Sequence, residues 1–316
     1  MEQKTRWDRL KRSETAHGYF LVGPPAIYAL LLLAAPLATI ALYSFLTDGY
    51  LEIIYRFSLC NFAGECASYK RAADGQLVEA QKYLGAWSDP VMRAVMLRSL
   101  WVAGAVTLVT VVLAFPVAYF VSFHVAPDRK SLWLFLITIP FWTSYLIRVF
   151  LWKVILGFNG VINSGLLGLG IIHEPLTFIL YNANAVVITL AHAYAPFAIL
   201  PIFVALEKID RSLLEAGLDL GESKLMTFWR VTLPLAMPGV IASVLIVFIP
   251  TIGDYVTPQL VGGPEGRMVA NLIQLQYLKL DNYPLGSAIA VSAMSIVTVV
   301  SLVFLFLNRR FLRGPK

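Results

Sequence analysis

The sequence predicts an all-α membrane protein with six transmembrane helices. Of its 316 residues, 58% are hydrophobic and 14% are charged, whereas a soluble domain carries about 25% charged residues. Apolar runs that are long enough to cross a bilayer as helices recur along the chain. The basic residues, which give a net charge of +6, cluster at the ends of these runs. Membrane topology therefore explains them better than a nucleic-acid partner does.

The first predicted span covers residues 19–46 and follows a polar N-terminal tail, residues 1–18. As a helix the run would extend about 40 Å, more than the apolar region of a cleaved signal peptide, and it lacks a small-residue cleavage site. We therefore expect this span to be retained. Pro24, Pro25 and Pro36 predict a kinked or late-starting helix, which membrane neighbours can tolerate.

A mixed, polar loop of residues 47–96 follows the first span, and a connection of this length usually has structure of its own. It contains both cysteines of the chain, Cys60 and Cys66. In an oxidising compartment the two could form a disulfide. Two free thiols are an equally good interpretation, because a separation of six residues fixes no geometry.

Five further apolar runs predict the remaining helices, which make up a core of residues 97–307. The runs are residues 97–123, 132–156, 185–206, 238–260 and 285–307. The Gly-rich segment 157–184 is too interrupted to predict another span. We expect it to lie along the outer face or to re-enter the membrane.

The distribution of positive charge predicts the orientation. Six spans put both termini on one side, and fifteen of the 25 Lys and Arg residues lie in segments on that side. These segments are the tails 1–18 and 308–316, the loop around Arg129, and the loop 207–234. The positive-inside rule therefore places both termini and loop 207–234 in the cytoplasm, and loop 47–96 in the periplasm.

Loop 207–234 predicts a short helix that a partner could bind. Asp210 can cap its start and Gly221 favours its end, which leaves about three turns between them. Glu215 and Asp219 share a face, and their like charges favour a basic groove in the partner. A second face has apolar residues and a small pair, Ala216 and Gly217, that would let another backbone approach closely. Its four residues are Leu213, Ala216, Gly217 and Leu220.

Seven residues of this loop fit the motif E-A-A-x3-G-x9-I-x-L-P, with Gly in place of the second Ala and Val in place of Ile. They are Glu215, Ala216, Gly217, Gly221, Val231, Leu233 and Pro234. In these residues the chain resembles the membrane subunits of bacterial ABC importers. The resemblance implies a type I importer permease whose cytoplasmic loop docks as a coupling helix into an ATP-hydrolysing subunit.

Three other segments, PFWTSYLIRVFLW, NGVINSGLLGLGIIHEPLTF and FIPTIGDYVTPQLVGG, resemble spermidine/putrescine-type permease subunits. The resemblance implies a multi-pass protein of the bacterial inner membrane, surrounded by lipid, that imports a polyamine. It also implies a second homologous permease, a dimer of ATP-binding cassette subunits and a periplasmic solute-binding protein as partners. The alternatives are an ABC importer of an amino-acid derivative, an opine or a metal chelate, and an ion-coupled secondary transporter.

The sequence does not predict an enzyme. It has no phosphate-cradling G-x-x-x-x-G-K-[ST] run, so we expect a partner ATPase, and not this chain, to bind ATP and Mg. Its histidines show no metal-ligand spacing, so we expect neither a metal site nor another cofactor in this chain.

Asp254 is the strongest candidate for a residue that meets the solute. An ionisable residue costs about 2.5 to 3.5 kcal/mol near the centre of a membrane helix, which makes it a functional candidate. Pro250, Gly253 and Pro258 predict a break in the fifth helix around it. With Tyr255 beside it, the carboxylate would suit a cationic amine. The alternative is that Asp254 caps a helix end near the outer interface.

The third span adds Trp142, Tyr145 and Arg148 as candidates for the substrate path. Tyr145 and Arg148 are three residues apart, so they share one face of a helix that could line a pore. The alternatives are packing or interface roles for the two aromatic residues and snorkelling to the outer surface for Arg148.

Overall fold

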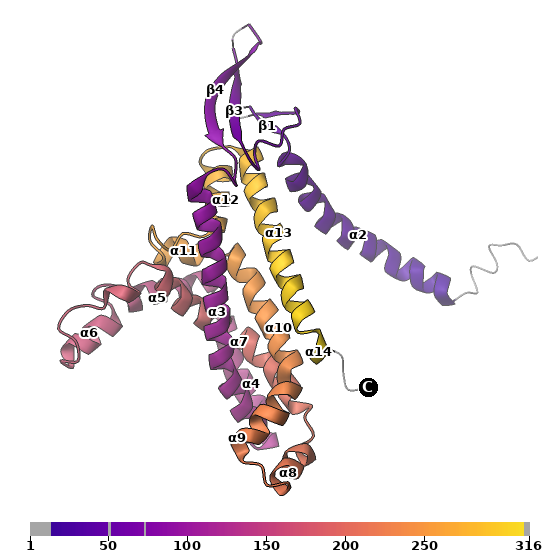
Figure 1. Cartoon of the computed structure of the whole chain (residues 1–316), viewed down its shortest axis with the longest axis vertical. Helices are drawn as coiled ribbons and strands as arrows, with labels where there is room; N and C mark the ends of the chain where they lie inside the picture. The colour runs from indigo at the N-terminus through magenta and orange to yellow at the C-terminus, as the bar shows by residue number, and fades with distance from the viewer. Residues whose placement is uncertain (1–13, 50–51, 73, 313–316) are drawn as a thin grey trace, which may run out of the picture.

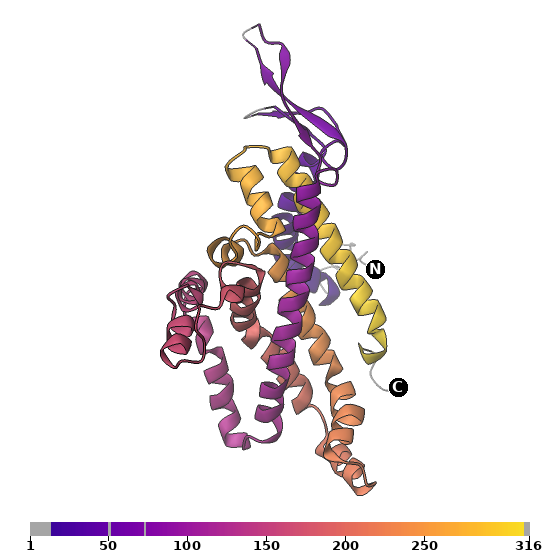
Figure 2. The same ribbon diagram turned by 60° about the vertical axis from the view of Figure 1, so that its left-hand side comes forward.

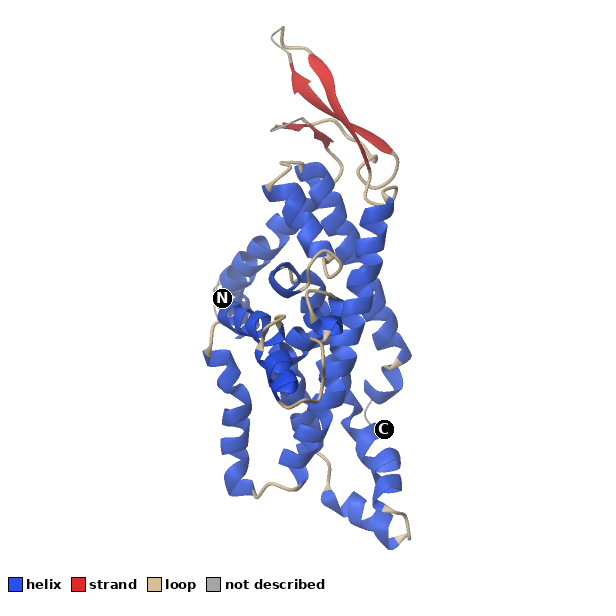
Figure 3. Ribbon diagram, turned by 90° about the vertical axis from the view of Figure 1, so that its left-hand side faces the viewer, coloured by secondary structure: helices blue, strands red, loops and turns tan. Residues whose placement is uncertain are grey.

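The computed structural model describes residues 14–49, 52–72 and 74–312 (Figure 1). Long helices form a bundle, and two small β hairpins project from one end of it (Figure 3). The short helices α8 (Arg211–Asp219) and α9 (Lys224–Thr227) lie at the opposite end (Figure 1). The predicted N-terminal tail lies outside the described residues up to residue 13, and the C-terminal tail does so from residue 313.

Six stretches of the described residues are long and apolar enough to cross a membrane, which confirms the predicted number of spans. Five of them contain one long helix each, namely α2 (Glu14–Tyr43), α3 (Pro90–Phe123), α7 (Ala183–Glu207), α10 (Leu233–Gly253) and α13 (Tyr283–Leu307). The other stretch, residues 145–168, combines α5 (Tyr145–Leu156) with α6 (Val161–Gly168).

Helices α3, α7 and α10 form the centre of the bundle. Small and β-branched side chains are buried where they meet, among them Val102, Val106, Ala198 and Val247. At Gly239 of α10, a Cβ atom would lie only 2.5 Å from the carbonyl oxygen of Pro201 in α7. The missing side chain therefore lets the two helices approach closely, as small residues do between membrane helices.

Two helices differ from their predicted form. α2 runs without interruption through the three prolines that were expected to kink or delay it. α3 begins at Pro90, seven residues before the predicted span, because Asp89 caps it. The Asp89 carboxylate accepts hydrogen bonds from the backbone N–H groups of Val91 and Met92, at 2.7 and 3.3 Å.

The third predicted span, residues 132–156, is wrong as a single helix. α4 (Pro127–Thr138) turns back beside the lower part of α3 (Figure 2), and a 3₁₀ turn, η1 (Ile139–Trp142), separates it from α5. Pro140 explains the interruption, because it has no N–H to donate and its ring clashes with the preceding helical turn. The chain changes direction here.

The Gly-rich segment after α5 contains α6 and a 3₁₀ turn, η2 (Thr177–Ile179). α5 packs against α7 and α11, and α6 extends beyond it, away from the bundle, as an arm (Figure 1). The fifth span stops at Gly253, and α11 (Val256–Val261) follows after two residues, which confirms the predicted break. α12 (Val269–Leu278), which was not predicted, then leads to α13, and α14 (Arg309–Leu312) ends the described chain.

Residues 47–84 form two antiparallel hairpins, which we call the β subdomain and which the all-α prediction did not include. Strand β1 (Thr47–Asp48) pairs with β2 (Ile53–Ile54), and β3 (Glu65–Arg71) pairs with β4 (Leu77–Leu84). The all-α class with six membrane helices is confirmed, and this loop adds two hairpins to it.

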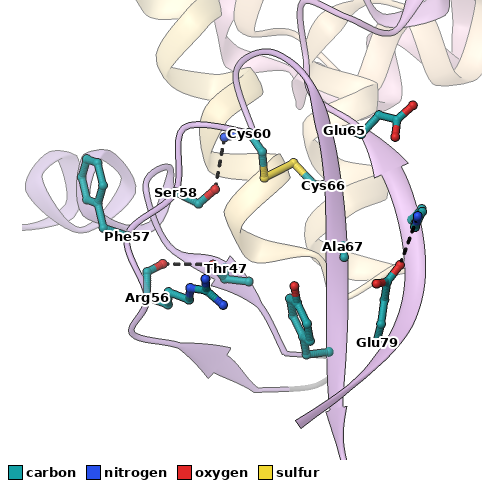
Figure 4. A pocket seen from close by; sticks show the side chains of 11 residues that line it. Thr47, Arg56, Phe57, Ser58, Cys60, Glu65, Cys66, Ala67 and Glu79 are labelled. Atoms are coloured by element: carbon teal, nitrogen blue, oxygen red, sulfur yellow. Dashed lines mark hydrogen bonds and ion pairs between the residues drawn. A yellow bond between two sulfur atoms is a disulfide. The ribbon is translucent and has the colours of Figure 1, made fainter.

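A disulfide joins Cys60 and Cys66 in the β subdomain, with a Cα–Cα distance of 5.3 Å. The sequence allows either a disulfide or two free thiols, and the structure contains the disulfide. Figure 4 shows the bond beside a hollow of about 370 Å³, whose lining includes the charged residues Arg56, Glu65 and Glu79.

Asn61, next to the disulfide, holds the base of the β subdomain. Its buried amide nitrogen donates to the carbonyl oxygens of Ser44 and Leu46, and its amide oxygen accepts from the Tyr83 hydroxyl at 2.9 Å. Burial raises the pKa of the Tyr83 phenol. These bonds fix the hairpins to the end of α2.

Candidate coupling loop and translocation path

The helix predicted in loop 207–234 is α8, and its ends are where the sequence indicates. The Asp210 carboxylate accepts a hydrogen bond from the backbone N–H of Ser212 at 3.0 Å, and this contact lowers the pKa of Asp210. Gly221 follows the helix with φ of +87°, in the left-handed region that residues with a Cβ rarely adopt.

The outer surface of α8 is available to a partner. Glu215 and Asp219 are exposed, and neither forms an ion pair within the described part of the chain. Ala216 and Leu213 are also exposed, and the Leu220 side chain is 85% exposed.

Gly217 has a packing role within the chain that the sequence did not predict. A Cβ atom at this position would lie 3.2 Å from Cγ2 of Thr227, which is buried on α9. Gly217 therefore lets α9 of the same chain pack closely, and its contact with a partner's backbone stays a prediction. Ala216, one residue earlier, remains on the exposed surface.

Leu233 and Pro234 are the first residues of α10 and are half-buried, so they pack partly within this chain. They follow a π-helical turn, η3 (Phe228–Thr232), in which the N–H of Leu233 donates to the carbonyl of Phe228. Because Pro234 has no N–H, the carbonyl of Arg230 lacks its α-helical donor, which accounts for the wider turn. α9, η3 and α10 consequently form one continuous helical stretch from the loop to Gly253.

Asp254 lies at the end of that stretch and is only 8% exposed. The Tyr145 hydroxyl donates to Oδ2 of Asp254 at 2.6 Å. The other oxygen, Oδ1, accepts from the backbone N–H groups of Val256 and Thr257 at 2.9 and 3.4 Å. Asp254 therefore caps the start of α11, as the alternative interpretation predicts. Its bond to Tyr145 also joins it to the third predicted span.

All the donors that the structure gives Asp254 are neutral. Within the described residues, no Lys, Arg or His nitrogen lies within 4.0 Å of its carboxylate. Thr257, whose hydroxyl oxygen lies 2.7 Å from that of Tyr145, completes the cluster. Sequence analysis missed Thr257, although it lies within the segment around the helix break.

None of the other candidates of the substrate path donates a hydrogen bond to the Asp254 carboxylate within the described residues. Tyr255 is partly exposed and lines a hollow of about 400 Å³ with Gln274 and Tyr277. Trp142 is 80% exposed, and its ring lies near Phe135 of α4. It belongs to the outer surface of this chain.

Arg148 lies one turn after Tyr145 on α5. Its Nη2 donates to the carbonyl of Thr143 at 3.2 Å, and its buried Nε has no hydrogen-bond partner among the described residues. On the next turn, Trp152 donates to Nδ1 of His192 in α7 at 3.1 Å. The sequence offered no signal for this contact between α5 and α7.

Solved structures of transport proteins share the fold of this chain. The chain superimposes on a bacterial alginate ABC transporter in complex with alginate pentasaccharide-bound periplasmic protein, with a TM-score of 0.67 over 98% of this chain and 99% of that chain. The sequence identity is 15%, so this likeness concerns the fold alone. The MetNI methionine ABC transporter gives a TM-score of 0.51 and 18% identity over 71% of this chain and all of that one.

Residues 83–314 match the family described as binding-protein-dependent transport system inner membrane component. The chain belongs to this family and is a multi-pass permease subunit of the inner membrane. Residues 47–82, which include most of the β subdomain, lie outside the match.

Relatives within the family are considerably more similar. The spermidine/putrescine transport system permease protein PotB of Escherichia coli is 38% identical over 216 residues, which are 68% of this chain and 78% of that protein. PotB of Haemophilus influenzae is 37% identical over 70% of this chain and 77% of its own length. The inner membrane ABC transporter permease protein YdcU of Escherichia coli is 32% identical over 67% of this chain and 70% of its own length.

Proposed function

We propose that this permease forms half of the translocation path for a polyamine such as spermidine or putrescine. The observation that carries the proposal is the buried Asp254 carboxylate, which has only neutral donors at a break between two helices. The names of the PotB relatives point to the same class of solute.

The chemistry of the Asp254 cluster suits an amine. A carboxylate in a site of low dielectric attracts a cation more strongly than it would in water, and the hydrogen bonds from Tyr145 and Val256 hold its two oxygens in place. An ammonium group could pair with the carboxylate and contact the aromatic face of Tyr255. A polyamine has several such groups separated by methylene segments, which suits a path with apolar walls.

The other components of the importer are also part of this proposal. A second, homologous permease would complete the path, and a periplasmic binding protein would deliver the solute. A dimer of ATP-binding cassette subunits would bind ATP and Mg in the cytoplasm, where both termini of this chain also lie. The exposed carboxylates of Glu215 and Asp219 support α8 as the element that such an ATPase grips.

The continuous helical stretch from α9 to Gly253 offers a route for coupling. It is 30 residues long, so it extends about 45 Å as a helix. When the ATPase subunits close, α8 would move, and the attached stretch would shift its far end beside Asp254. The carboxylate would then face alternate sides of the membrane during each cycle.

A second candidate is an ABC importer of another small solute, such as an amino-acid derivative, an opine or a metal chelate. The observation that favours it is Arg148, whose buried Nε could bind an anionic group of the solute. Asp254 and Arg148 together would then recognise a zwitterion.

Reconstitution of the complex tests the proposal. This chain would be purified with the permease, ATPase and binding protein encoded with it, and ATP hydrolysis would be measured with spermidine, putrescine and an amino acid. We expect stimulation by a polyamine that requires the binding protein. Stimulation by the amino acid alone would remove the polyamine assignment, and failure to recover any ATPase with the chain would contradict ATP-driven import.

A further inference from the structure

The base of loop 207–234 carries a charged cluster that the function described so far does not use. It joins the end of α7, the start of α8, the end of α3 and the start of α4. Its members are Ser122, Lys130, Glu207 and Arg211. We call it the loop-base cluster.

Glu207 is the centre of the loop-base cluster. Its Oε1 accepts from the Lys130 ammonium at 2.6 Å and from the Ser122 hydroxyl at 2.7 Å. Arg211, in the first turn of α8, donates to the carbonyl of Ser122 at 2.9 Å, and its guanidinium lies 5.4 Å from the centre of the Phe123 ring. The Lys130 side chain is 14% exposed and the Glu207 side chain 33%, so water reaches the pair from the Glu207 side. Charge-assisted hydrogen bonds of this kind are stronger than neutral ones.

The other end of the loop is fastened to the same helix. The Phe228 ring packs edge-on against Phe115 and Tyr119 of α3, with centroid distances of 5.6 and 5.9 Å. Loop 207–234 is therefore attached to the last three turns of α3 at both of its ends. A movement of α8 relative to α3 would have to break one of these contacts.

α3 continues from this point to the opposite end of the molecule. It has 34 residues, about 51 Å of helix, and in its first half Met92 and Met96 belong to a buried cluster that also contains residues of α12 and α13. Directly before α3, the Trp87 indole N–H donates to the hydroxyl of Ser292 in α13 at 3.0 Å. α3 thus joins the loop to the end that carries the β subdomain, a second connection beside the one through α10.

We propose that Lys130 and Glu207 are positioning residues for coupling. Lys130 of α4 fixes the Glu207 carboxylate against Ser122 of α3, which holds the junction between α7 and α8 on α3, so that a movement of α8 reaches α3 and the opposite end of the permease. This inference rests on the proposed function, because it assumes that a partner ATPase moves α8. Without the pair, α8 still binds the ATPase through its exposed surface, but ATP hydrolysis no longer responds to the solute-loaded binding protein.

The first test compares Lys130→Met with Lys208→Met in the reconstituted complex. Lys208 is an exposed lysine one residue from Glu207 that forms no ion pair among the described residues, so it controls for the loss of one positive charge. We expect Lys130→Met to recover the normal amount of ATPase while the ratio of stimulated to basal hydrolysis falls about tenfold, the effect of losing one charge-assisted hydrogen bond. Lys208→Met should keep the wild-type ratio. A wild-type ratio in Lys130→Met would overturn the proposal.

A charge exchange separates positioning from a structural role. The double variant Lys130→Glu with Glu207→Lys can form the pair in the opposite sense, and we expect it to regain most of the stimulation that either single change removes. A purely structural role predicts less assembled complex in the single variants but an unchanged ratio, and this outcome would also overturn the proposal.

A distance measurement between α3 and α8 tests the proposal whichever solute the importer carries. Spin labels at Val117→Cys in α3 and Leu218→Cys in α8 report their separation, and the two native cysteines are bonded to each other. We expect a single narrow distance with and without ATP in the wild-type background, and a broad distribution after Lys130→Met. Equal distributions in both backgrounds would contradict the proposal even if the solute is not a polyamine. A complex that no polyamine stimulates, but whose distances behave as expected, would count against the proposed solute alone.

Discussion

The hydroxyl of Tyr145 lies 2.6 Å from the carboxylate of Asp254, although the two residues are 109 positions apart in the chain. The bond joins α5, at the root of the arm, to the point where α10 ends and α11 begins. These hydrogen bonds orient the carboxylate, and no cationic side chain among the described residues pairs with it. The arrangement leads directly to a test of the proposed path.

Asp254→Asn should lower polyamine uptake about tenfold or more, because it removes the charge that pairs with an ammonium group. The amide oxygen can still accept from the N–H of Val256, so the cap of α11 should persist. Tyr145→Phe keeps the charge and removes one hydrogen bond, so its effect should be smaller. Initial uptake rates at equal membrane abundance measure both. Normal uptake by Asp254→Asn would show that the residue acts as a helix cap alone.

Substitutions of increasing size at Gly217 test how closely α8 packs on α9. We expect Gly217→Ala to be tolerated, because the Thr227 side chain needs to move by only a few tenths of an ångström and Ala favours a helix by about 1 kcal/mol. Gly217→Leu should separate the two helices and lower the amount of ATPase that co-purifies with the permease. Leu218→Ala, on an exposed position of the same helix, is the control for helix stability. Equal recovery with Gly217→Leu would contradict the observed packing.

The disulfide predicts that the isolated protein has no titratable thiol. Both cysteines of the sequence take part in the bond, so thiol reagents should react only after reduction. In the chain-entropy model, closing a loop of this size contributes about 2 kcal/mol to the stability of the β subdomain. Replacing both cysteines by serine should therefore speed proteolysis between residues 52 and 84, while the bundle stays intact. Two reactive thiols in protein recovered from the membrane would contradict the bond.

The features that sequence reasoning predicted correctly depend on local signals. Asp210 and Gly221 set the ends of α8 through contacts within a few residues, and the break before Asp254 follows from the backbone chemistry of Gly and Pro. The number of spans follows from hydrophobicity alone. These parts of the fold need no knowledge of what lies beside them.

The features that were missed depend on neighbours distant in sequence or lack a pattern. β4 is exposed along almost its whole length, so it shows no alternation of buried and exposed residues that could predict a strand. The packing of Gly217 against Thr227 depends on how the chain turns between α8 and α9. The bonds from Tyr145 to Asp254 and from Lys130 to Glu207 join different helices, and only tertiary packing brings these residues together.

The central claim of this account is that α8 transmits ATP hydrolysis in a partner subunit to the transport path. The most direct test is solute-stimulated ATP hydrolysis by the complex containing Glu215→Lys, beside Asp128→Lys as a charge reversal at another exposed acid of the chain. We expect Glu215→Lys to abolish the stimulation, because it places a cation against the basic groove proposed for the ATPase, and Asp128→Lys to preserve it. Normal stimulation and normal ATPase recovery with Glu215→Lys would contradict the claim.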